Sequence, residues 1–290
     1  MTVVLITGGS GFIGSCLKRQ LRADYNPNPI FRNQQYEILT PPRILVDWTN
    51  SEEVKSYFAQ NQDIDVVIHC ASIGGRRLNT DGVNVLVDNV RMFENIVAYK
   101  LSYTVIINMS SGAAYDRERH LIEVSESKIL TYLPKDMYGL AKNLIAKRCY
   151  GLERCYNLIL FNCFGPTEAE GRFVTGAINA IKSNEPFTIT PRLMDFFYIN
   201  DLVTIVKFYI EEIFNGSRLL PNSLNCVYNG ACATFGILHM LQAMMKIEAR
   251  INVMPHDKPY CGSSKLLQGL NIPHLNLDTG LKDGLRDCIK

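Results

Sequence analysis

One segment constrains the fold of this chain most: residues 7–14, with the sequence TGGSGFIG. It follows the apolar run at residues 3–6 and leads into a helix-like segment at residues 15–21. A buried strand, a glycine turn and a helix N-terminus form a cradle for a dinucleotide pyrophosphate, because backbone N–H groups face the anion and glycine lets it approach closely. A tight turn that binds nothing is the alternative, since a glycine pattern alone is weakly specific. The position directly after the first strand favours a Rossmann-type α/β domain. Its expected cofactor contacts are Gly8, Gly11, Phe12, Ile13 and Gly14.

The composition describes an ordinary globular protein. The chain has 290 residues, of which 47% are hydrophobic and 20% charged. This length suits one large α/β domain, or a Rossmann core with a smaller companion. The formal net charge is +2 and the basic residues are scattered among acidic ones, which argues against a nucleic-acid partner.

The cysteines and histidines argue against disulfides and metal sites. Nine cysteines is an odd number without a Cys-x-x-Cys motif, so free thiols in a reducing compartment are expected. The five histidines lack metal-ligand spacing. A strand is expected within two residues of the N-terminus and no apolar stretch is long enough to span a bilayer. We therefore expect a cytoplasmic protein without a metal or a membrane partner.

The expected second strand, residues 36–40, bears on the choice of cofactor. An acidic residue at the end of this strand usually accepts the adenosine ribose hydroxyls, whereas a basic or hydroxyl group accommodates a 2′-phosphate. The strand ends at Thr40 with Arg43 close by, and no carboxylate stands there. NADP is therefore favoured over NAD, although Glu37 is available if the strand ends two residues earlier.

Two further strands are expected to bring residues to the cofactor. Residues 44–46 predict a short strand that leads to Asp47 and Trp48. Asp47 either accepts a hydrogen bond from the adenine amino group or serves as a turn or cap residue. Residues 65–72 predict a buried strand, in which His69 is expected to be a packed residue. The cofactor contacts from this region are Cys70, Ala71, Ser72 and, on the helix expected at residues 84–99, Asn89.

The expected catalytic residues are Ser111, Tyr138 and Lys142. Tyr138 and Lys142 are four positions apart, which places them one turn apart on the same face of a helix. A free phenol has a pKa of about 10, and a fixed ammonium nearby favours the phenolate. Ser111, at the end of the strand expected at residues 103–109, can bond the same substrate oxygen. Such a trio can exchange a proton at an oxygen while a hydride moves at its carbon.

Five motifs together resemble those of the extended short-chain dehydrogenase/reductases of the nucleotide-sugar epimerase/dehydratase/reductase group. They are the segment at residues 7–14, Ser110-Ser111 before Tyr115, the Tyr138 and Lys142 pair, NCFGP at residues 162–166 and DFFYINDL at residues 195–202. The resemblance covers nearly the whole chain. It implies that Ser111 polarises the oxygen, that Tyr138 is the acid/base, and that Lys142 tunes Tyr138 and holds the nicotinamide ribose.

Within this group the chain is most similar to GDP-fucose synthases and 4-keto-6-deoxy sugar reductases. GDP-fucose synthases use a cysteine and a histidine to epimerise carbons 3 and 5 before reduction. The corresponding positions here are Gly112 and Thr167, neither of which can abstract a proton. The resemblance therefore implies an NADPH-dependent C4 reductase that does not epimerise first, with Cys163, His69 or Glu168 open as replacements.

Three other functions stay open. Residues 112–115 read GAAY, without the Asp-Glu pair of resembling dehydratases, so a dehydratase is disfavoured. An NAD-dependent nucleotide-sugar 4-epimerase has the same trio, and a bifunctional epimerase/reductase is a further alternative. A non-catalytic cofactor-binding protein would be expected to lose the base or the lysine, and both are present here.

The resemblance implies a nucleotide-diphosphate sugar as substrate, linked to GDP, dTDP, CDP or UDP. Two departures from the family pattern concern its contacts: Met194 stands where an Arg usually precedes Asp195, and Ile159 replaces a frequent Arg. The loop at residues 74–77 carries two arginines that contact a substrate phosphate or lie on the solvated surface. The expected substrate contacts are Gly75, Arg76, Ser111, Gly112, Asn162, Arg172, Arg192 and Lys265.

The expected domain division follows the resemblance. A Rossmann domain spans residues 1–165, with residues 195–232 returning to it, and residues 166–194 and 233–290 form a small substrate-binding lobe. The helices expected at residues 84–99 and 138–152 carry apolar residues on more than one face. In resembling enzymes this pair packs against its copy, so a homodimer is expected.

Overall fold

The computed structural model describes residues 1–22, 36–75, 81–216 and 218–290. It forms two compact units. The first contains residues 1–117, 127–159 and 206–224, and the second contains residues 118–126, 160–205 and 225–290. The predicted Rossmann domain also included residues 118–126, 160–165, 195–205 and 225–232, which lie in the second unit.

The first unit is built on a six-stranded sheet with the order β11-β6-β4-β3-β1-β2. Strand β1 pairs in parallel with β2 and with β3, and β3 pairs in parallel with β4. Parallel strands need crossover helices, which cover both faces, and nearly all residues of the central strands β1, β3 and β4 are accordingly buried. The bounds are Thr2–Thr7 for β1, Tyr36–Leu39 for β2, Val66–His69 for β3, Val105–Ser111 for β4, Cys155–Leu160 for β6 and Ser223–Cys226 for β11.

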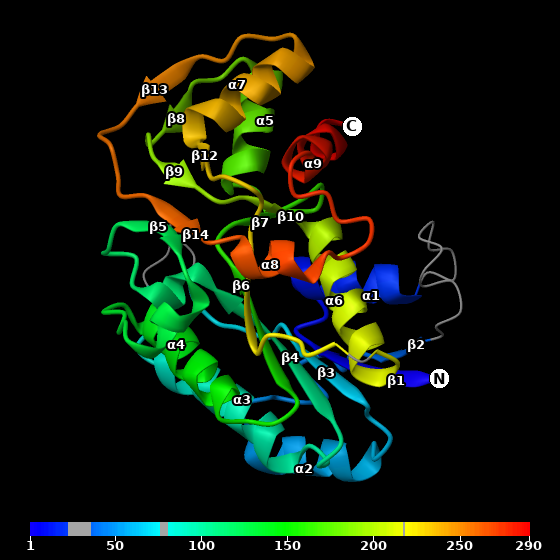
Figure 1. The fold of residues 1–290 in the computed structure, drawn as a ribbon. Helices are drawn as coiled ribbons and strands as arrows, with labels where there is room; N and C mark the ends of the chain where they lie inside the picture. Colours follow the sequence, from blue (N-terminus) through cyan, green and yellow to red (C-terminus); the bar gives the residue numbers. More distant parts are fainter. Residues whose placement is uncertain (23–35, 76–80, 217) are drawn as a thin grey trace. The chain divides into compact units, whose positions relative to one another are not determined.

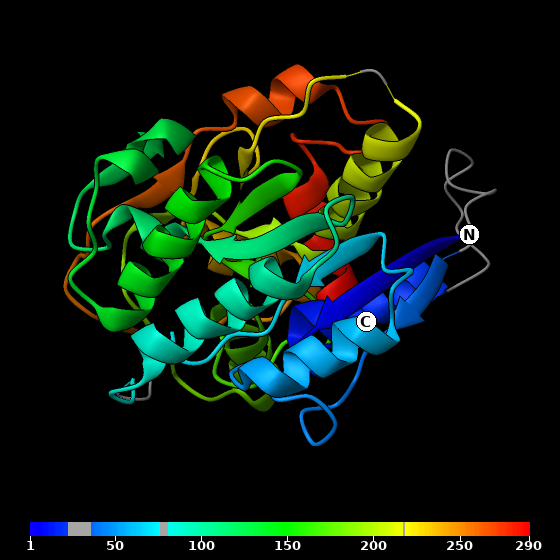
Figure 2. The same cartoon turned by 90° about the horizontal axis from the view of Figure 1, so that it is seen from below.

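Helices lie on both faces of this sheet (Figures 1 and 2). On one face, buried side chains of α2, α3 and α4 pack on β1, β3 and β4 in one core that includes Leu5, Val67, Phe93, Ile106 and Ile145. Helix α1 and residues 206–214 of α6 cover the other face (Figure 1). The helix bounds are Phe12–Arg22 for α1, Ser51–Gln60 for α2, Val85–Tyr99 for α3, Met137–Tyr150 for α4 and Ile199–Phe214 for α6. The predicted Rossmann α/β class is confirmed.

The strand predicted at residues 44–46 is wrong, because this segment is a turn. The carbonyl oxygen of Pro42 accepts hydrogen bonds from the N–H groups of Leu45, at 2.9 Å, and Val46, at 3.2 Å. The chain therefore reverses directly after its two prolines, and Ile44 is 92% exposed instead of lying in a sheet. Only Val46 and Trp48 are buried, and they anchor the segment to the core.

The second unit combines short strands with four whole helices and residues 199–205 of α6. Its largest sheet has the order β12-β9-β14-β5, and β10 pairs with β7 and β13 with β8. The strand bounds are Leu121–Val124 for β5, Cys163–Phe164 for β7, Phe187–Ile189 for β8, Leu193–Met194 for β9, Phe197–Tyr198 for β10, Cys232–Ala233 for β12, Ile251–Val253 for β13 and Tyr260–Gly262 for β14. The helices are α5 (Phe173–Ser183), α7 (Thr234–Met245), α8 (Lys265–Leu270) and α9 (Gly280–Ile289).

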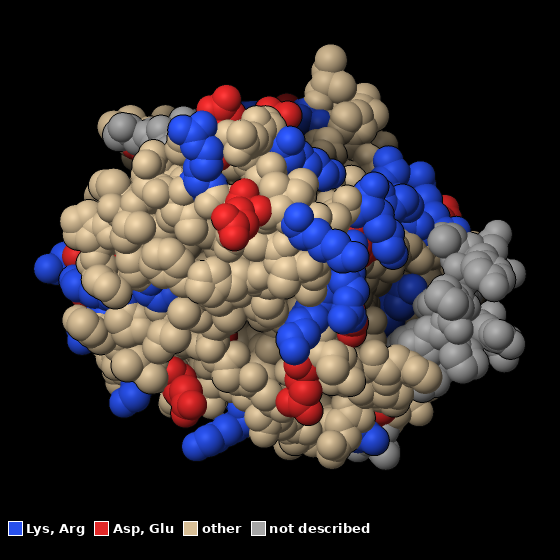
Figure 3. Space-filling model, turned by 90° about the horizontal axis from the view of Figure 1, so that it is seen from above, with Lys and Arg blue, Asp and Glu red and all other residues tan. Residues whose placement is uncertain are grey.

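The chemical character of the chain is plain in the structure. All nine cysteines are free thiols. Within the described ranges no helix is long and apolar enough to cross a membrane. Acidic side chains lie among the basic ones on the face drawn in Figure 3.

Candidate active site

The glycine turn after β1 leaves no room for side chains. Gly8 has a φ of +67°, and a Cβ atom there would lie 2.7 Å from the backbone nitrogen of Ala71. A Cβ atom on Gly14 would overlap the carbonyl oxygen of Gly8. The N–H of Gly11 donates to that same oxygen at 3.0 Å, which closes the turn at the start of α1. These positions require glycine, as a close approach of backbone to a pyrophosphate does.

A cavity of about 380 Å³ lies in front of this turn. Its walls come from the glycine turn, α1, the 40–49 segment and the residues after β3. Its lining residues are Gly8, Gly9, Ser10, Lys18, Thr40, Pro41, Pro42, Arg43, Asp47, Trp48, Thr49, Ala71, Ser72, Ile73 and Met92. The combination of a side-chain-free turn, a helix N-terminus and an adjoining cavity fits a nicotinamide dinucleotide.

The expected cofactor residues fall into two groups. Gly8, Thr40, Arg43, Asp47, Trp48, Ala71 and Ser72 line the cavity, whereas Gly11, Phe12, Ile13, Gly14, Cys70 and Asn89 do not. Asn89 is buried, and its amide donates to the carbonyl oxygen of Ile73 at 2.8 Å. Its Oδ1 accepts from the Ile73 N–H at 3.0 Å and from the Ser72 hydroxyl at 3.1 Å. Asn89 therefore shapes the loop that forms one wall of the cavity.

Asp47 acts as a turn residue. Its Oδ1 accepts hydrogen bonds from the backbone N–H and the hydroxyl of Thr49, at 3.0 and 2.8 Å. The Arg43 guanidinium lies 3.2 Å from its other oxygen. The Thr49 backbone hydrogen bond is the main cause of the lowered pKa of Asp47, with Arg43 contributing. The cap of α2 is Asn50 instead, whose side chain accepts from the N–H groups of Glu52 and Glu53.

Lys18 is a cavity residue that was not among the predicted cofactor contacts. Lys18 is four residues after Gly14, so both lie on one face of α1, and its side chain lines the cavity together with Arg43. It forms no ion pair with any residue that the structure describes. The helical spacing from the last fingerprint glycine was the signal that could have identified it. Glu37 is exposed on β2 and does not line the cavity.

The structure brings Lys142 and Tyr138 together on α4. The Nζ atom of Lys142 lies 5.7 Å from the centre of the Tyr138 ring. Lys142 is 3% exposed, and its ammonium donates to the carbonyl oxygen of Met109 at 3.1 Å. Since Met109 lies two residues before Ser111 on β4, Lys142 ties the helix to the end of that strand.

The ends of β4 and α4 are held by further contacts. The Oγ atom of Ser111 accepts from the N–H of Ala113 at 3.2 Å and so begins the 3-10 helix Gly112–Tyr115. Asp136 caps α4, accepting from the N–H of Gly139 at 2.8 Å. A Cβ atom on Gly139 would lie 2.8 Å from the carbonyl oxygen of Ala113, so the helix and the 3-10 turn are in close contact.

The loop after β3 contacts Tyr138 directly. Gly75 has a φ of +76°, and a Cβ atom there would lie 2.6 Å from Cζ of Tyr138. The carboxylate of Asp81 accepts from the Gly75 N–H at 2.8 Å and holds the loop in this position. Arg76, expected as a substrate contact, lies outside the described residues.

Four of the expected substrate contacts lie in the second unit. Asn162 donates to the carbonyl oxygen of Asp195 at 2.9 Å. Arg172 pairs with the buried Glu168 at 3.0 Å. Lys265 lines a second cavity, of about 350 Å³.

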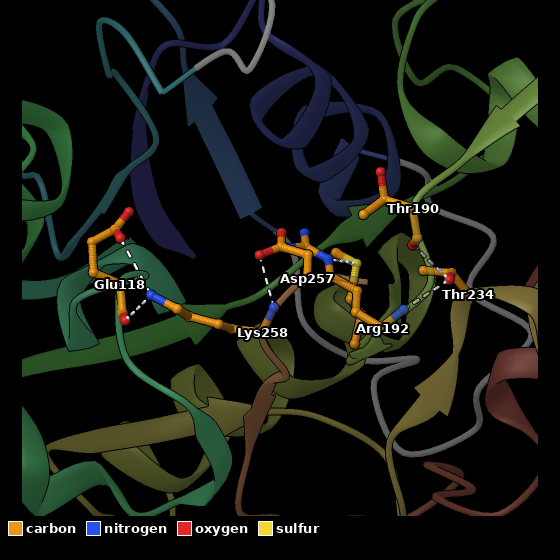
Figure 4. Close-up of polar contacts among 7 residues, drawn as sticks. Glu118, Thr190, Arg192, Thr234, Asp257 and Lys258 are labelled. Carbon is orange, nitrogen blue, oxygen red and sulfur yellow. Dashed lines mark hydrogen bonds and ion pairs between the residues drawn. The ribbon is translucent and has the colours of Figure 1, made fainter. Parts of the chain in front are cut away.

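The fourth of these contacts, Arg192, belongs to the polar network in Figure 4. Its guanidinium pairs with Asp257 at 2.7 Å, and its Nε atom lies 2.8 Å from Sδ of Met194. Lys258, next to Asp257, donates to the backbone carbonyl oxygen of Glu118 at 2.6 Å. Because residues 192 and 194 lie on one side of an extended chain, Arg192 places its charge beside the position where the family pattern has an arginine.

Two of the alternative acid/base residues have environments that argue against the role. Burial is the main cause that lowers the pKa of His69 to about 3, so the ring is neutral, and it bonds the Thr7 hydroxyl at 2.9 Å. Glu168 is buried, and its carboxylate is held in an ion pair with Arg172 at 3.0 Å, so it is not free to abstract a proton. Cys163 is 6% exposed.

Comparisons with known proteins agree with this arrangement. Residues 4–225 match the model of the NAD dependent epimerase/dehydratase family. The chain is similar to a GDP-L-fucose synthase from Azorhizobium caulinodans, with 31% identity over 173 residues, or 56% of this chain and 52% of that protein. The chain thus spans about half the length of that curated relative.

Two other similar proteins are matched over more of their length. A CDP-abequose synthase from Salmonella muenchen is 25% identical, over 74% of this chain and 72% of that protein. A GDP-mannoheptose C4 reductase from Campylobacter jejuni, solved with NADP bound, has a TM-score of 0.79 at 15% identity, over 99% of this chain and 96% of that one.

These findings define the class of the protein: it has the Rossmann-type α/β fold with a glycine turn after the first strand, and residues 4–225 match one family of that fold. The chain belongs to the NAD-dependent epimerase/dehydratase family.

Proposed function

We propose that this protein is an NADPH-dependent reductase of a nucleotide-linked 4-keto-6-deoxy sugar and acts without prior epimerisation at carbons 3 and 5. The observation that carries the proposal is the buried Lys142 ammonium beside the Tyr138 ring, at the end of the strand that carries Ser111. Gly112 and Thr167, where an epimerising relative would need an acid and a base, offer neither. The resemblance to nucleotide-sugar reductases supplies the substrate class.

The proposed roles follow from the positions of these side chains. The Ser111 hydroxyl donates to the C4 oxygen and polarises it, and the Tyr138 hydroxyl donates the proton that this oxygen takes up. The Lys142 ammonium, 5.7 Å from the centre of the Tyr138 ring, places a positive charge beside the ring whose hydroxyl gives up the proton. The glycine turn and the 40–49 segment would hold a nicotinamide dinucleotide, which would supply the hydride when bound.

We further propose NADP as the preferred dinucleotide. Lys18 and Arg43 bring two cations to the cavity, and Asp47, the one carboxylate among the described lining residues, is engaged by Thr49 and Arg43. A 2′-phosphate needs cationic or hydroxyl partners, and Thr40 at the end of β2 provides a hydroxyl.

The test is NADPH oxidation with GDP-, dTDP-, CDP- and UDP-linked 4-keto-6-deoxy sugars. We expect turnover with one of them and a loss of about 100-fold or more in kcat for Tyr138→Phe, with NADPH affinity kept. Arg148→Met, an exposed residue of the same helix, is the control. Turnover that survives in Tyr138→Phe would contradict the proposed role.

A nucleotide-sugar 4-epimerase is the second candidate, because the same trio serves that reaction and the matching family model includes epimerases. An epimerase returns the hydride to the carbon that gave it and keeps its dinucleotide. NAD retained through purification, with interconversion of two nucleotide sugars and no net NADPH oxidation, would favour it.

A further inference from the structure

The second unit contains a cavity of about 350 Å³ whose charged lining residues are Glu123 and Lys265. The other described residues around it are mostly polar or small. They are Ile122, Leu193, Tyr228, Asn229, Gly230, Ala231, Cys261, Gly262, Ser263, Ser264 and Gln268. A cavity of this size with few convergent polar groups is typical of a small-molecule site.

Glu123 reaches the cavity through an irregularity in strand β5. The parallel pairing of β5 with β14 aligns Leu121 with Tyr260 and Val124 with Gly262. Two residues of β5 therefore lie between these pairs where β14 has one, so β5 carries one extra residue, a β-bulge. Bulges in parallel pairs are rare, and they turn a side chain away from the direction that regular alternation would give it.

The backbone at Glu123 is strained. Its φ is +46°, in the left-handed region that non-glycine residues rarely adopt. Both sides of the bulge are held: the Leu121 N–H donates to Pro259 at 3.1 Å, and the Val124 carbonyl oxygen accepts from the Ser263 N–H at 3.0 Å. Leu121 and Val124 are buried while Glu123 is exposed. The surrounding structure therefore imposes the bulge, and such strain is concentrated at functional sites.

The carboxylate of Glu123 forms no hydrogen bond or ion pair with any described residue, although Lys265 lines the same cavity. The negative charge of Glu123 also contributes to the raised pKa of the buried Asp195. Burial is the main cause that raises this pKa to about 7, and Glu123 is a further one. A carboxylate kept near another acid and without a partner is available to a ligand.

We propose that Glu123 is a specificity-determining residue whose carboxylate accepts hydrogen bonds from two neighbouring hydroxyl groups of the ligand in this cavity. Lys265, on the same cavity, suits the adjacent phosphate. Vicinal hydroxyls next to a phosphate occur in the ribose of a nucleoside diphosphate and in the sugar of a sugar phosphate. The inference rests on the proposed function, because the ligand it names is the nucleotide sugar of the proposed reaction.

The experiment measures the binding of GDP-mannose, dTDP-glucose, CDP-glucose and UDP-glucose to the full chain by titration calorimetry, together with thermal unfolding. For the tightest of these probes we expect Glu123→Ala and Glu123→Gly to raise Kd about tenfold. We also expect Glu123→Gly to raise the Tm by about 2 °C, since glycine adopts the left-handed conformation freely.

Lys246→Gly is the matched control. Lys246 is an exposed residue with a φ of +57° at the end of α7, and it does not line the cavity. We expect this variant to raise the Tm similarly and to leave Kd unchanged. If Glu123→Gly binds the probe more weakly while its Tm does not fall, the weaker binding reflects the lost carboxylate and not damage to the fold.

Two further arms assign the hydroxyl groups. If the free nucleoside diphosphate also binds Glu123→Ala about tenfold more weakly than it binds the wild type, the carboxylate binds the ribose. If only the sugar 1-phosphate binds the variant more weakly than the wild type, the carboxylate binds the sugar. Wild-type affinity in Glu123→Ala, with weaker binding in Lys265→Met, would overturn the role of Glu123. Binding of NADPH but of no nucleotide sugar to the wild type would instead overturn the proposed function.

Discussion

At the scale of single residues, Gly75 links the conformation of a loop to the position of Tyr138. Gly75→Ala places a methyl group within 2.6 Å of the ring and forces alanine into a φ of +76°. We expect kcat to fall about 10- to 100-fold, because a displacement of about 1 Å of a reacting group has this effect. Steady-state kinetics, with NADPH affinity measured separately, tests this.

The matched control for that variant is Gly82→Ala. A Cβ atom at Gly82 would have no neighbour within 4 Å among the residues that the structure describes, and its φ is not in the left-handed region. We expect wild-type kcat for Gly82→Ala. Wild-type kcat in Gly75→Ala as well would show that the ring is free to move without cost.

Lys18 is a residue-scale test of the preference for NADP. We expect Lys18→Met to raise the Kd of NADPH about tenfold and to leave that of NADH unchanged, because a charge-assisted contact to the 2′-phosphate is lost. Fluorescence titration with both dinucleotides measures this. Arg19→Met, the next residue of α1 and outside the cavity, serves as the control. An equal effect on NADPH and NADH would assign Lys18 to another part of the dinucleotide.

At the scale of elements, Asp195 connects three short strands of the second unit. It lies between β9 and β10, and its carboxylate accepts from the N–H of Gly262 on β14 at 2.6 Å. Burial raises its pKa from 3.8 to about 7. Folding thus favours the neutral carboxyl, so its contribution to stability falls as the pH rises from about 4 to about 7, and above that range the buried charge opposes folding.

Asp195→Asn is therefore expected to reduce the loss of stability between pH 5 and pH 8. The asparagine Oδ1 can still accept from Gly262, and it carries no charge to bury. We expect the decrease in Tm over this range to be several degrees smaller than in the wild type. Thermal unfolding at the two pH values measures it, with the exposed Asp63→Asn as the control. A larger decrease in Asp195→Asn than in the wild type would contradict the assigned environment.

The segment between β2 and α2 was predicted to contain a strand and instead forms a turn. Its apolar residues 44–46 suggested a strand, but Pro41 and Pro42 lack the N–H groups that a strand inside a sheet needs. The Pro42 carbonyl oxygen instead closes a turn. The regular helices and buried strands of the first unit were predictable because their apolar residues recur with the period of the element.

At the scale of the whole molecule, we propose a homodimer formed through α3 and α4. The two helices are joined by the Arg148–Glu94 ion pair at 3.1 Å, and they leave Val87, 49% exposed, and Leu144, 40% exposed, on their outer surface. Burying this surface against a second copy would supply the apolar centre that a stable interface needs.

Light scattering at micromolar concentration tests this proposal. We expect a dimer for the wild type and a monomer for the double variant Val87→Arg and Leu144→Arg, since buried unpaired charges are costly. Leu219→Arg, at a residue that is 97% exposed elsewhere in the first unit, should leave the dimer intact. A monomeric wild type would refute the proposal.

The amino-acid sequence by itself determined the α/β class, the glycine turn and the shared helix face of Tyr138 and Lys142, because each follows from local spacing along the chain. It could not determine that Asn89 shapes a cavity wall or that Gly75 touches Tyr138. Those contacts join residues that are distant in sequence, and only the packing of strands and helices brings them together. The strained conformation of Glu123 was likewise decided by tertiary structure, because the hydrogen bonds that impose it come from residues about 140 positions later in the chain.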